Sequence, residues 1–140
     1  MWLTSIQVND QPHKAVIYYG DKIEITLSCM SEAETNGFVG LVLTDQDGGK
    51  TINANNRYQR NILRLSNGVN AISCKLGMVP LMEGTYYLTI YLGDESRDIQ
   101  VIENAVVIEV HEKDVWGNGK LPPRRVSSFW WNTEFKLERI

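Results

Sequence analysis

The chain has 140 residues, of which 43% are hydrophobic, and this is enough for one domain with its own core. Its net charge is −3, and the basic residues form no run longer than the pair Arg124 and Arg125, which argues against a duplex nucleic-acid binder. No segment is apolar over the length that spans a bilayer, and residues 1–4 lack the basic start of a signal peptide. We therefore expect a cytoplasmic domain that binds no nucleic acid.

Short apolar alternations separated by turn residues follow one another along the chain. Glycines such as Gly20, Gly48 and Gly68 supply the positive φ that tight turns need. Single helical turns are expected at residues 31–35 and 98–104. The alternations predict strands at residues 3–8, 22–29, 37–44, 70–76, 85–93 and 105–111. This pattern predicts an all-β fold, an immunoglobulin-like antiparallel β-sandwich of about seven to nine strands.

The composition changes after residue 111. Residues 112–132 combine Gly, Pro and Trp and predict an irregular arm, because proline donates no hydrogen bond to a sheet. Residues 133–140 alternate apolar and charged side chains and predict one more strand, with Phe135, Leu137 and Trp131 facing inward. We expect a single domain over residues 1–140 with its core at 3–111. The stiff arm favours exchange of the C-terminal strand with a second chain.

The strand at residues 85–93 has an unusual outer face. Its leucines and isoleucine share one side, which must face the core. The other side carries Tyr87, Thr89 and Tyr91, where an ordinary sandwich strand has charged or small residues. Rings with hydroxyls suit a sugar, a partner sheet or the chain's own tail, and all three stay open. Tyr86 matches the tyrosine whose hydroxyl bonds back to the preceding loop in immunoglobulin-like domains.

A second candidate feature is the polar stretch at residues 53–61. It contains amides, two guanidinium groups and a phenol, which pair with sugar hydroxyls and with carboxylate or phosphate substituents. The alternative interpretation is a polar crossover loop at one edge of the sandwich. Together the two features predict glycan-binding residues Asn55, Arg57, Tyr58, Arg60, Tyr87 and Tyr91.

No catalytic or metal-binding constellation is recognisable. His13 and His111 fall in a loop and on the outer face of a strand, without a serine or cysteine nucleophile in a recognisable elbow. Asp45 and Asp47 fit a turn better than a calcium loop, which needs a third oxygen ligand and a distal Glu. We expect no enzymatic activity, no metal and no cofactor.

Two cysteines, Cys29 and Cys74, lie in apolar alternations of different predicted strands. Both are expected to point into the core as reduced thiols, as in other proteins of a reducing compartment. Neither has His or Cys at the spacing of metal ligands. We therefore expect both to be unreactive and structural.

Five segments occur in a recognisable order over residues 5–131. They are Tyr19-Gly20-Asp21 before a strand, residues 38–48 followed by an Asn-rich loop, residues 81–86, residues 104–110, and a Gly-rich tail that ends in Trp. This order resembles the C-terminal domain of Wzt, the ATP-binding component of bacterial O-antigen polysaccharide ABC exporters. The resemblance implies a non-catalytic, carbohydrate-binding sandwich that recognises the non-reducing terminus of an O-antigen-type polysaccharide. It also implies a homodimer that exchanges its C-terminal strand, and association with the ATP-binding domain and the membrane permease of an exporter at the inner membrane.

One departure separates the chain from a full transporter subunit. The ATP-binding loop G-x-x-x-x-G-K-[ST] is missing, because Gly117, Gly119 and Lys120 have the wrong spacing and no Ser or Thr follows. The chain is then expected to be either an excised domain or a free-standing relative. A second function class stays open, a dimerisation or assembly domain that binds no glycan.

Overall fold

The computed structural model describes residues 1–58, 61–113, 117, 119, 128–131 and 133–137. These residues form nine strands and no helix, so none of them belongs to a helix that could cross a membrane. The strands are β1 (Trp2–Val8), β2 (Lys14–Tyr18), β3 (Lys22–Ser31), β4 (Thr35–Asp45), β5 (Lys50–Asn55), β6 (Leu63–Leu65), β7 (Gly68–Met78), β8 (Gly84–Gly93) and β9 (Asp98–His111). The predicted all-β fold is confirmed.

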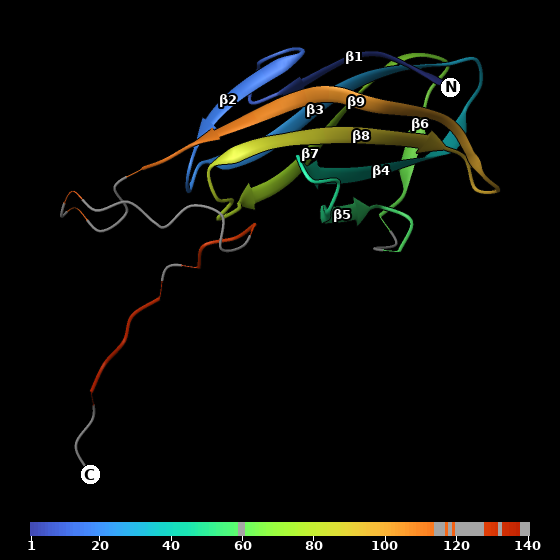
Figure 1. Cartoon of the computed structure of the whole chain (residues 1–140). Helices are drawn as coiled ribbons and strands as arrows, with labels where there is room; N and C mark the ends of the chain where they lie inside the picture. Colours follow the sequence, from blue (N-terminus) through green and yellow to red (C-terminus); the bar gives the residue numbers. More distant parts are fainter. Residues whose placement is uncertain (59–60, 114–116, 118, 120–127, 132, 138–140) are drawn as a thin grey trace.

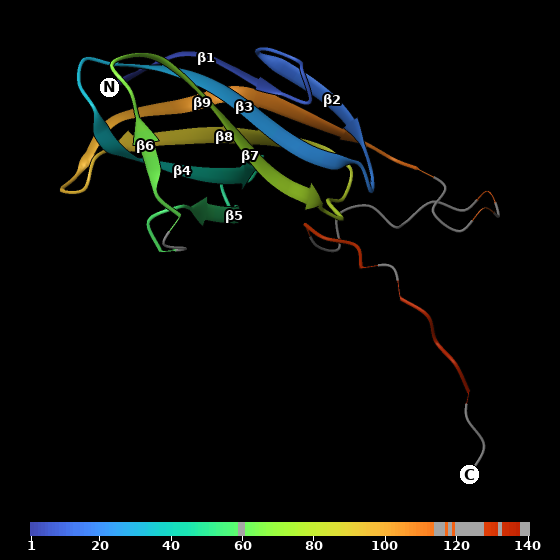
Figure 2. The same cartoon turned by 180° about the vertical axis from the view of Figure 1, so that it is seen from behind.

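The strands pack as two sheets. The sheet that contains β8 and β9 faces the viewer in Figure 1, and the sheet that contains β3 and β7 faces the viewer in Figure 2. The smaller sheet has the order β1-β3-β7 and the larger β2-β9-β8-β4-β5, with β6 paired to one end of β4. β2 runs parallel to β9, whereas all other strand pairs are antiparallel, so the larger sheet is mixed. The chain crosses between sheets after β1 through Asn9, Asp10 and His13, which all have positive φ. This crossing places β2 parallel to the last strand, as in immunoglobulin-like sandwiches.

The core lies between the two sheets and is densest along β8. Leu88, Ile90 and Leu92 are at most 1% exposed, and burial of each is worth about 1.5–3 kcal/mol. The hydroxyl of Tyr86 donates a 2.8 Å hydrogen bond to the Met82 carbonyl, which confirms the predicted tyrosine bond to the preceding loop. The apolar side of this strand therefore faces inward as predicted.

Three strands escaped the sequence analysis, and two predicted helical turns are wrong. β2 and β6 are short, and β5 is an edge strand of polar, half-buried residues without apolar alternation. The expected turn at residues 31–35 joins the end of β3 to the start of β4, and the one at 98–104 is the first half of β9. Pairing with β8 overrides the weak local helix signal of that segment.

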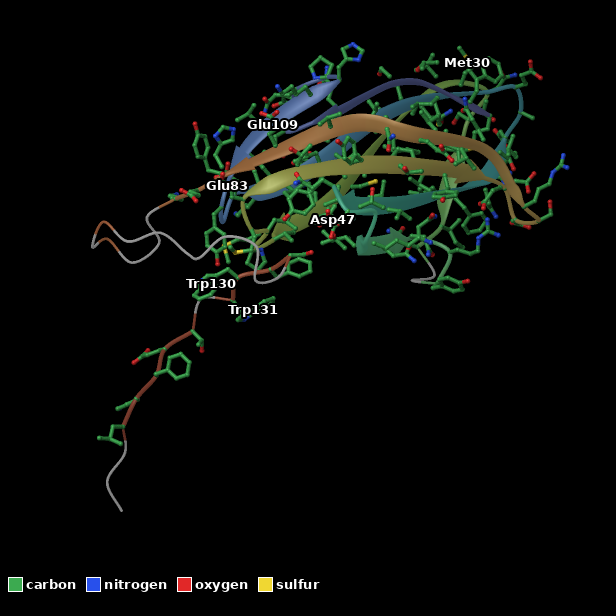
Figure 3. The ribbon with its side chains drawn as sticks, viewed as in Figure 1. Met30, Asp47, Glu83, Glu109, Trp130 and Trp131 are labelled. Atoms are coloured by element: carbon green, nitrogen blue, oxygen red, sulfur yellow. The ribbon has the colours of Figure 1, made fainter. Side chains whose placement is uncertain are left out.

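The tail returns to the sandwich before it leaves it. The Met82 amide donates to the Ser128 carbonyl at 2.8 Å, and the Trp130 amide donates to the Pro80 carbonyl at 2.9 Å. The hydroxyl of Tyr19 donates to the Trp130 carbonyl. Figure 3 shows Trp130 and Trp131 where the tail leaves the sandwich. Residues 128–130 of the expected arm therefore contact the sandwich of their own chain.

Beyond this anchor the described tail pairs with no strand of its own chain. Residues 133–137 have no strand assignment, and Phe135 and Leu137 are 91% and 92% exposed. Trp131 is 74% exposed. The inward orientation expected for these three side chains is therefore wrong among the described residues of one chain, which leave them exposed. Residues 138–140 of the expected strand, and the arm residues 114–116, 118, 120–127 and 132, lie outside the described residues.

The cysteines occupy the smaller sheet. Cys29 is fully buried, as expected, whereas Cys74 is only half-buried at the rim of the core. Cys29 lies opposite Asn70 and Cys74 opposite Ile25, so the two are four positions apart along the β3–β7 pair. Burial raises the pKa of both thiols, which keeps them protonated near neutral pH.

We expect iodoacetamide to modify both cysteines slowly at pH 7.5, because the thiolate is the nucleophile and the raised pKa suppresses it. Cys74 should react faster than Cys29, since only Cys74 is partly accessible. Mass spectrometry of the native protein over time, with the urea-unfolded protein as the fast control, measures both rates. Native Cys29 reacting as fast as the unfolded chain would contradict this expectation.

Candidate functional site

A groove of about 300 Å³ opens on the outer face of the larger sheet, across β4, β5 and β8. It brings together four of the six residues that the sequence predicted as a site. Three come from the end of β5 and the loop after it, and the fourth comes from β8, far along the chain. These four are Asn55, Arg57, Tyr58 and Tyr91. We call this hollow the tyrosine groove.

The loop that follows β5 is held by Asn56, a residue that the sequence analysis did not single out. The Asn56 side chain is 8% exposed and makes three hydrogen bonds. Its Oδ1 accepts from the Val39 amide at 2.7 Å, and its Nδ2 donates to the carbonyls of Gly37 and Asn61 at 3.1 and 2.8 Å. This buried amide fixes the loop to β4, so that the neighbouring Asn55 and Arg57 reach the groove.

Arg57 closes one end of the tyrosine groove. Its guanidinium carbon lies 4.4 Å from the ring centre of Phe38, a cation–π contact. Its nitrogens donate to the Asp94 and Glu95 carbonyls at 3.2 and 3.5 Å, and Nη2 lies 3.7 Å from Asp98 Oδ1. Arg57 therefore ties the loop after β5 to the turn between β8 and β9.

That turn is itself rigid. Asp94 Oδ1 accepts hydrogen bonds from the Ser96 amide, the Ser96 hydroxyl and the Arg97 amide, and these bonds lower the pKa of the Asp94 carboxyl. A Cβ on Gly93 would lie 2.4 Å from the Arg97 carbonyl oxygen, so the turn requires glycine there. The carbonyls that hold Arg57 are consequently fixed before any ligand arrives.

The floor of the groove is formed by Gly40 and the ring of Tyr91. The two residues are direct partners in the β4–β8 pair, and a Cβ on Gly40 would lie 3.3 Å from Tyr91 Cβ. A glycine within a strand leaves backbone open to a neighbouring ring or to a ligand. This glycine is a signal in the sequence that could have pointed to the groove.

One predicted site residue, Tyr87, lies outside the tyrosine groove. Tyr87 shares the outer face of β8 with Tyr91 but lies four positions away, roughly 13 Å along the strand. Its neighbour across the β4–β8 pair is Thr44. Arg60 lies outside the described residues. Conversely, the sequence analysis missed the groove residues Phe38, Gly40, Lys50 and Asp98, and it included Asn53 only as part of the polar stretch.

The features that could have indicated catalysis or a metal have structural roles. Asp45 Oδ1 accepts from the amides of Asp47 and Gly49 at 3.0 and 2.8 Å, which confirms the predicted turn. His13 has positive φ and lies in the segment that crosses between the sheets. Nε2 of His111 lies 3.8 Å from Oε2 of Glu109, on the outer face of β9. No group of three or more His, Cys, Asp or Glu converges within the described part of the chain.

Comparison with known proteins identifies the family. The family model of the Wzt C-terminal domain matches residues 4–120. The chain belongs to this family. A crystal structure of the C-terminal domain of Wzt has a TM-score of 0.63 at 15% identity, over 93% of this chain and 87% of that one. At this identity the match shows a shared fold.

A more distant structural match is a β-glucosidase from Listeria innocua, with a TM-score of 0.39 and 14% identity over 78% of this chain. The match spans only 16% of that enzyme, and at this TM-score it says nothing about function. None of the curated proteins compared with this chain matches it.

Proposed function

We propose that this Wzt C-terminal domain is a non-catalytic carbohydrate-binding module that recognises the non-reducing terminus of an O-antigen-type polysaccharide for ABC-transporter export. Membership of the family supports the general class, a carbohydrate-binding domain of an ABC exporter. The observation that carries the proposal is the tyrosine groove, where Tyr91 and Tyr58 stand beside the amides of Asn53 and Asn55. Aromatic rings stack on sugar faces, and amides pair with sugar hydroxyls.

The chemistry of the groove fits weak and specific recognition. Tyr58 is 85% exposed, so stacking on it is partial, and each amide contributes about 1 kcal/mol. We expect affinities between millimolar and micromolar for a single site. Two copies in a homodimer would raise the apparent affinity for a polysaccharide.

The partners follow from the same proposal. We infer a homodimer that presents two tyrosine grooves, attached to the ATP-binding domain and the membrane permease of an exporter on the cytoplasmic side of the inner membrane. The exposed apolar side chains of Trp131, Phe135 and Leu137 support association with a second chain. They also favour the second candidate function, an assembly domain without a glycan ligand. The two functions differ in whether Tyr91 stays accessible in the dimer.

A glycan array of bacterial surface polysaccharides, followed by titration calorimetry on the best binder, tests the proposal. We expect Tyr91→Ala to weaken binding by about 1 kcal/mol, because a stacking surface is lost. Tyr18→Ala is the matched control, since Tyr18 is half-exposed on β2 outside the groove. Equal binding of the glycan by the parent, Tyr91→Ala and Tyr18→Ala would place its site outside the groove, whereas no binding by the parent would favour the assembly domain.

A further inference from the structure

The tyrosine groove is lined by two cationic side chains and one carboxylate, and only one of the two cations is paired with the carboxylate. Arg57 and Lys50 carry the positive charges, and Asp98 carries the negative one. Nη2 of Arg57 and Oδ1 of Asp98 lie 3.7 Å apart, so a positive and a negative charge stand side by side at this end of the groove. An anion that approached Arg57 would also meet the carboxylate of Asp98.

Some of the N–H donors of Arg57 are also engaged. Nη1 and Nη2 donate to the carbonyls of Glu95 and Asp94, and Phe38 covers one face of the guanidinium. These contacts orient the guanidinium and leave it fewer N–H groups for a carboxylate or phosphate. The geometry of Arg57 is that of a residue that holds the groove wall.

Lys50, unlike Arg57, has no carboxylate partner among the described residues. Among the described residues, no carboxylate oxygen lies within 4.0 Å of its ammonium group, and its side chain is exposed. The nearby Asp45 directs Oδ1 to the amides of its own turn. Figure 3 shows Asp47 in the same turn, before β5. Lys50 therefore gives the groove a net positive charge of one at the end away from Arg57.

The position of Lys50 also connects the groove to Tyr87. Lys50 and Tyr87 are the two neighbours of Thr44, one on each side of β4. From Lys50 to Asn55 is five residues of strand, roughly 16 Å. A saccharide that stacks on Tyr91 and extends along β5 would reach Lys50 beside Tyr87.

We propose that the tyrosine groove is polarised: Lys50 binds an anionic substituent, a carboxylate or phosphate, on the saccharide, and Arg57 positions the neutral end. This inference rests on the proposed function, because it assigns the ligand class of the same groove. A lysine is a mobile point charge without planar geometry, so it selects charge and tolerates either anion. Because the site is exposed, the interaction is screened by salt.

The test uses two matched probes, maltotriose and maltotriose with a 6-phosphate on one terminal glucose, because a trisaccharide can extend from Tyr91 to Lys50 and a single sugar cannot. Binding to the full chain is followed by amide NMR shifts at low salt. For the parent we expect tighter binding of the phosphorylated trisaccharide than of maltotriose, with shifts at Tyr91 for both probes. Lys50→Gln should weaken binding of the phosphorylated trisaccharide by at least about fivefold and leave maltotriose binding unchanged. Asp98→Asn should change the affinity for either probe by less than about twofold, because Asp98 lies beside Arg57 at the other end of the groove.

Lys22→Gln is the control for net charge, since Lys22 is exposed at the start of β3 in the other sheet. It should bind both probes like the parent. If maltotriose shifts Tyr91 in the parent but Lys50→Gln binds the phosphorylated trisaccharide like Lys22→Gln, the inference is overturned while the groove remains a saccharide site. If neither probe shifts groove residues of the parent, the inference is overturned, and the proposed function fails with it when the glycan array also finds no binder.

Discussion

Asn56→Ala should lower the free energy of unfolding by about 2–4 kcal/mol, one of the largest effects of any single polar residue in this domain. The side chain is buried and makes three hydrogen bonds, and alanine leaves the Val39 amide and two carbonyls without these partners. Urea unfolding followed by tryptophan fluorescence measures the change.

Asn53→Ala is the matched control for this prediction. Asn53 lies three positions earlier, on the exposed side of β5, so its removal should change stability by less than about 0.5 kcal/mol. Asn56→Ala should also weaken saccharide binding, because Asn55 and Arg57 follow the loop that Asn56 anchors. Equal unfolding midpoints for the two variants would show that the loop is held by other contacts.

The second large effect is expected from two truncations of the tail. A chain that ends at residue 131 keeps the anchor on Pro80 and Met82 and loses the exposed Phe135 and Leu137. It should be a stable monomer, because the alternating apolar side chains that support dimerisation are gone. Multi-angle light scattering against the full chain measures the mass.

A chain that ends at residue 127 should in addition lose about 2–4 kcal/mol of stability. It removes the hydrogen bonds of Met82 to Ser128 and of Trp130 to Pro80, together with the packing of Phe129 against the core. The difference in melting temperature between the two truncations separates anchoring from dimerisation. A dimer that persists when the chain ends at residue 131 would show that the interface is formed by another surface.

The groove variants distinguish the two candidate functions of this Wzt C-terminal domain. In a Wzt C-terminal domain that only assembles, Tyr91 would be buried between protomers, so Tyr91→Ala would weaken the dimer and no variant would change saccharide binding. In a domain that binds glycan, Tyr91→Ala would weaken binding of both probes and Lys50→Gln only that of the phosphorylated one, while the dimer persists. The same purified variants therefore test both function classes.

The sequence by itself determined the fold class and the orientation of the central strands. Period-two alternation decides which side of a strand is buried, and it placed Leu88, Ile90 and Leu92 correctly inward and Tyr91 outward. Position after a turn was enough to predict the hydrogen bond of Tyr86. These features depend on residues close together in the chain, and a single sequence contains that information.

Only the tertiary structure decided the site. Whether Asn55 and Arg57 lie beside Tyr91 depends on the pairing of β4 with both β5 and β8, which joins segments more than 30 residues apart. The partner of Arg57 is likewise Asp98 from another hairpin, and Lys50, which the sequence analysis did not single out, reaches the groove only through the pairing of β5 with β4. The tail shows the same limit, since its alternation predicted a strand but residues 133–137 pair with no strand among the described residues.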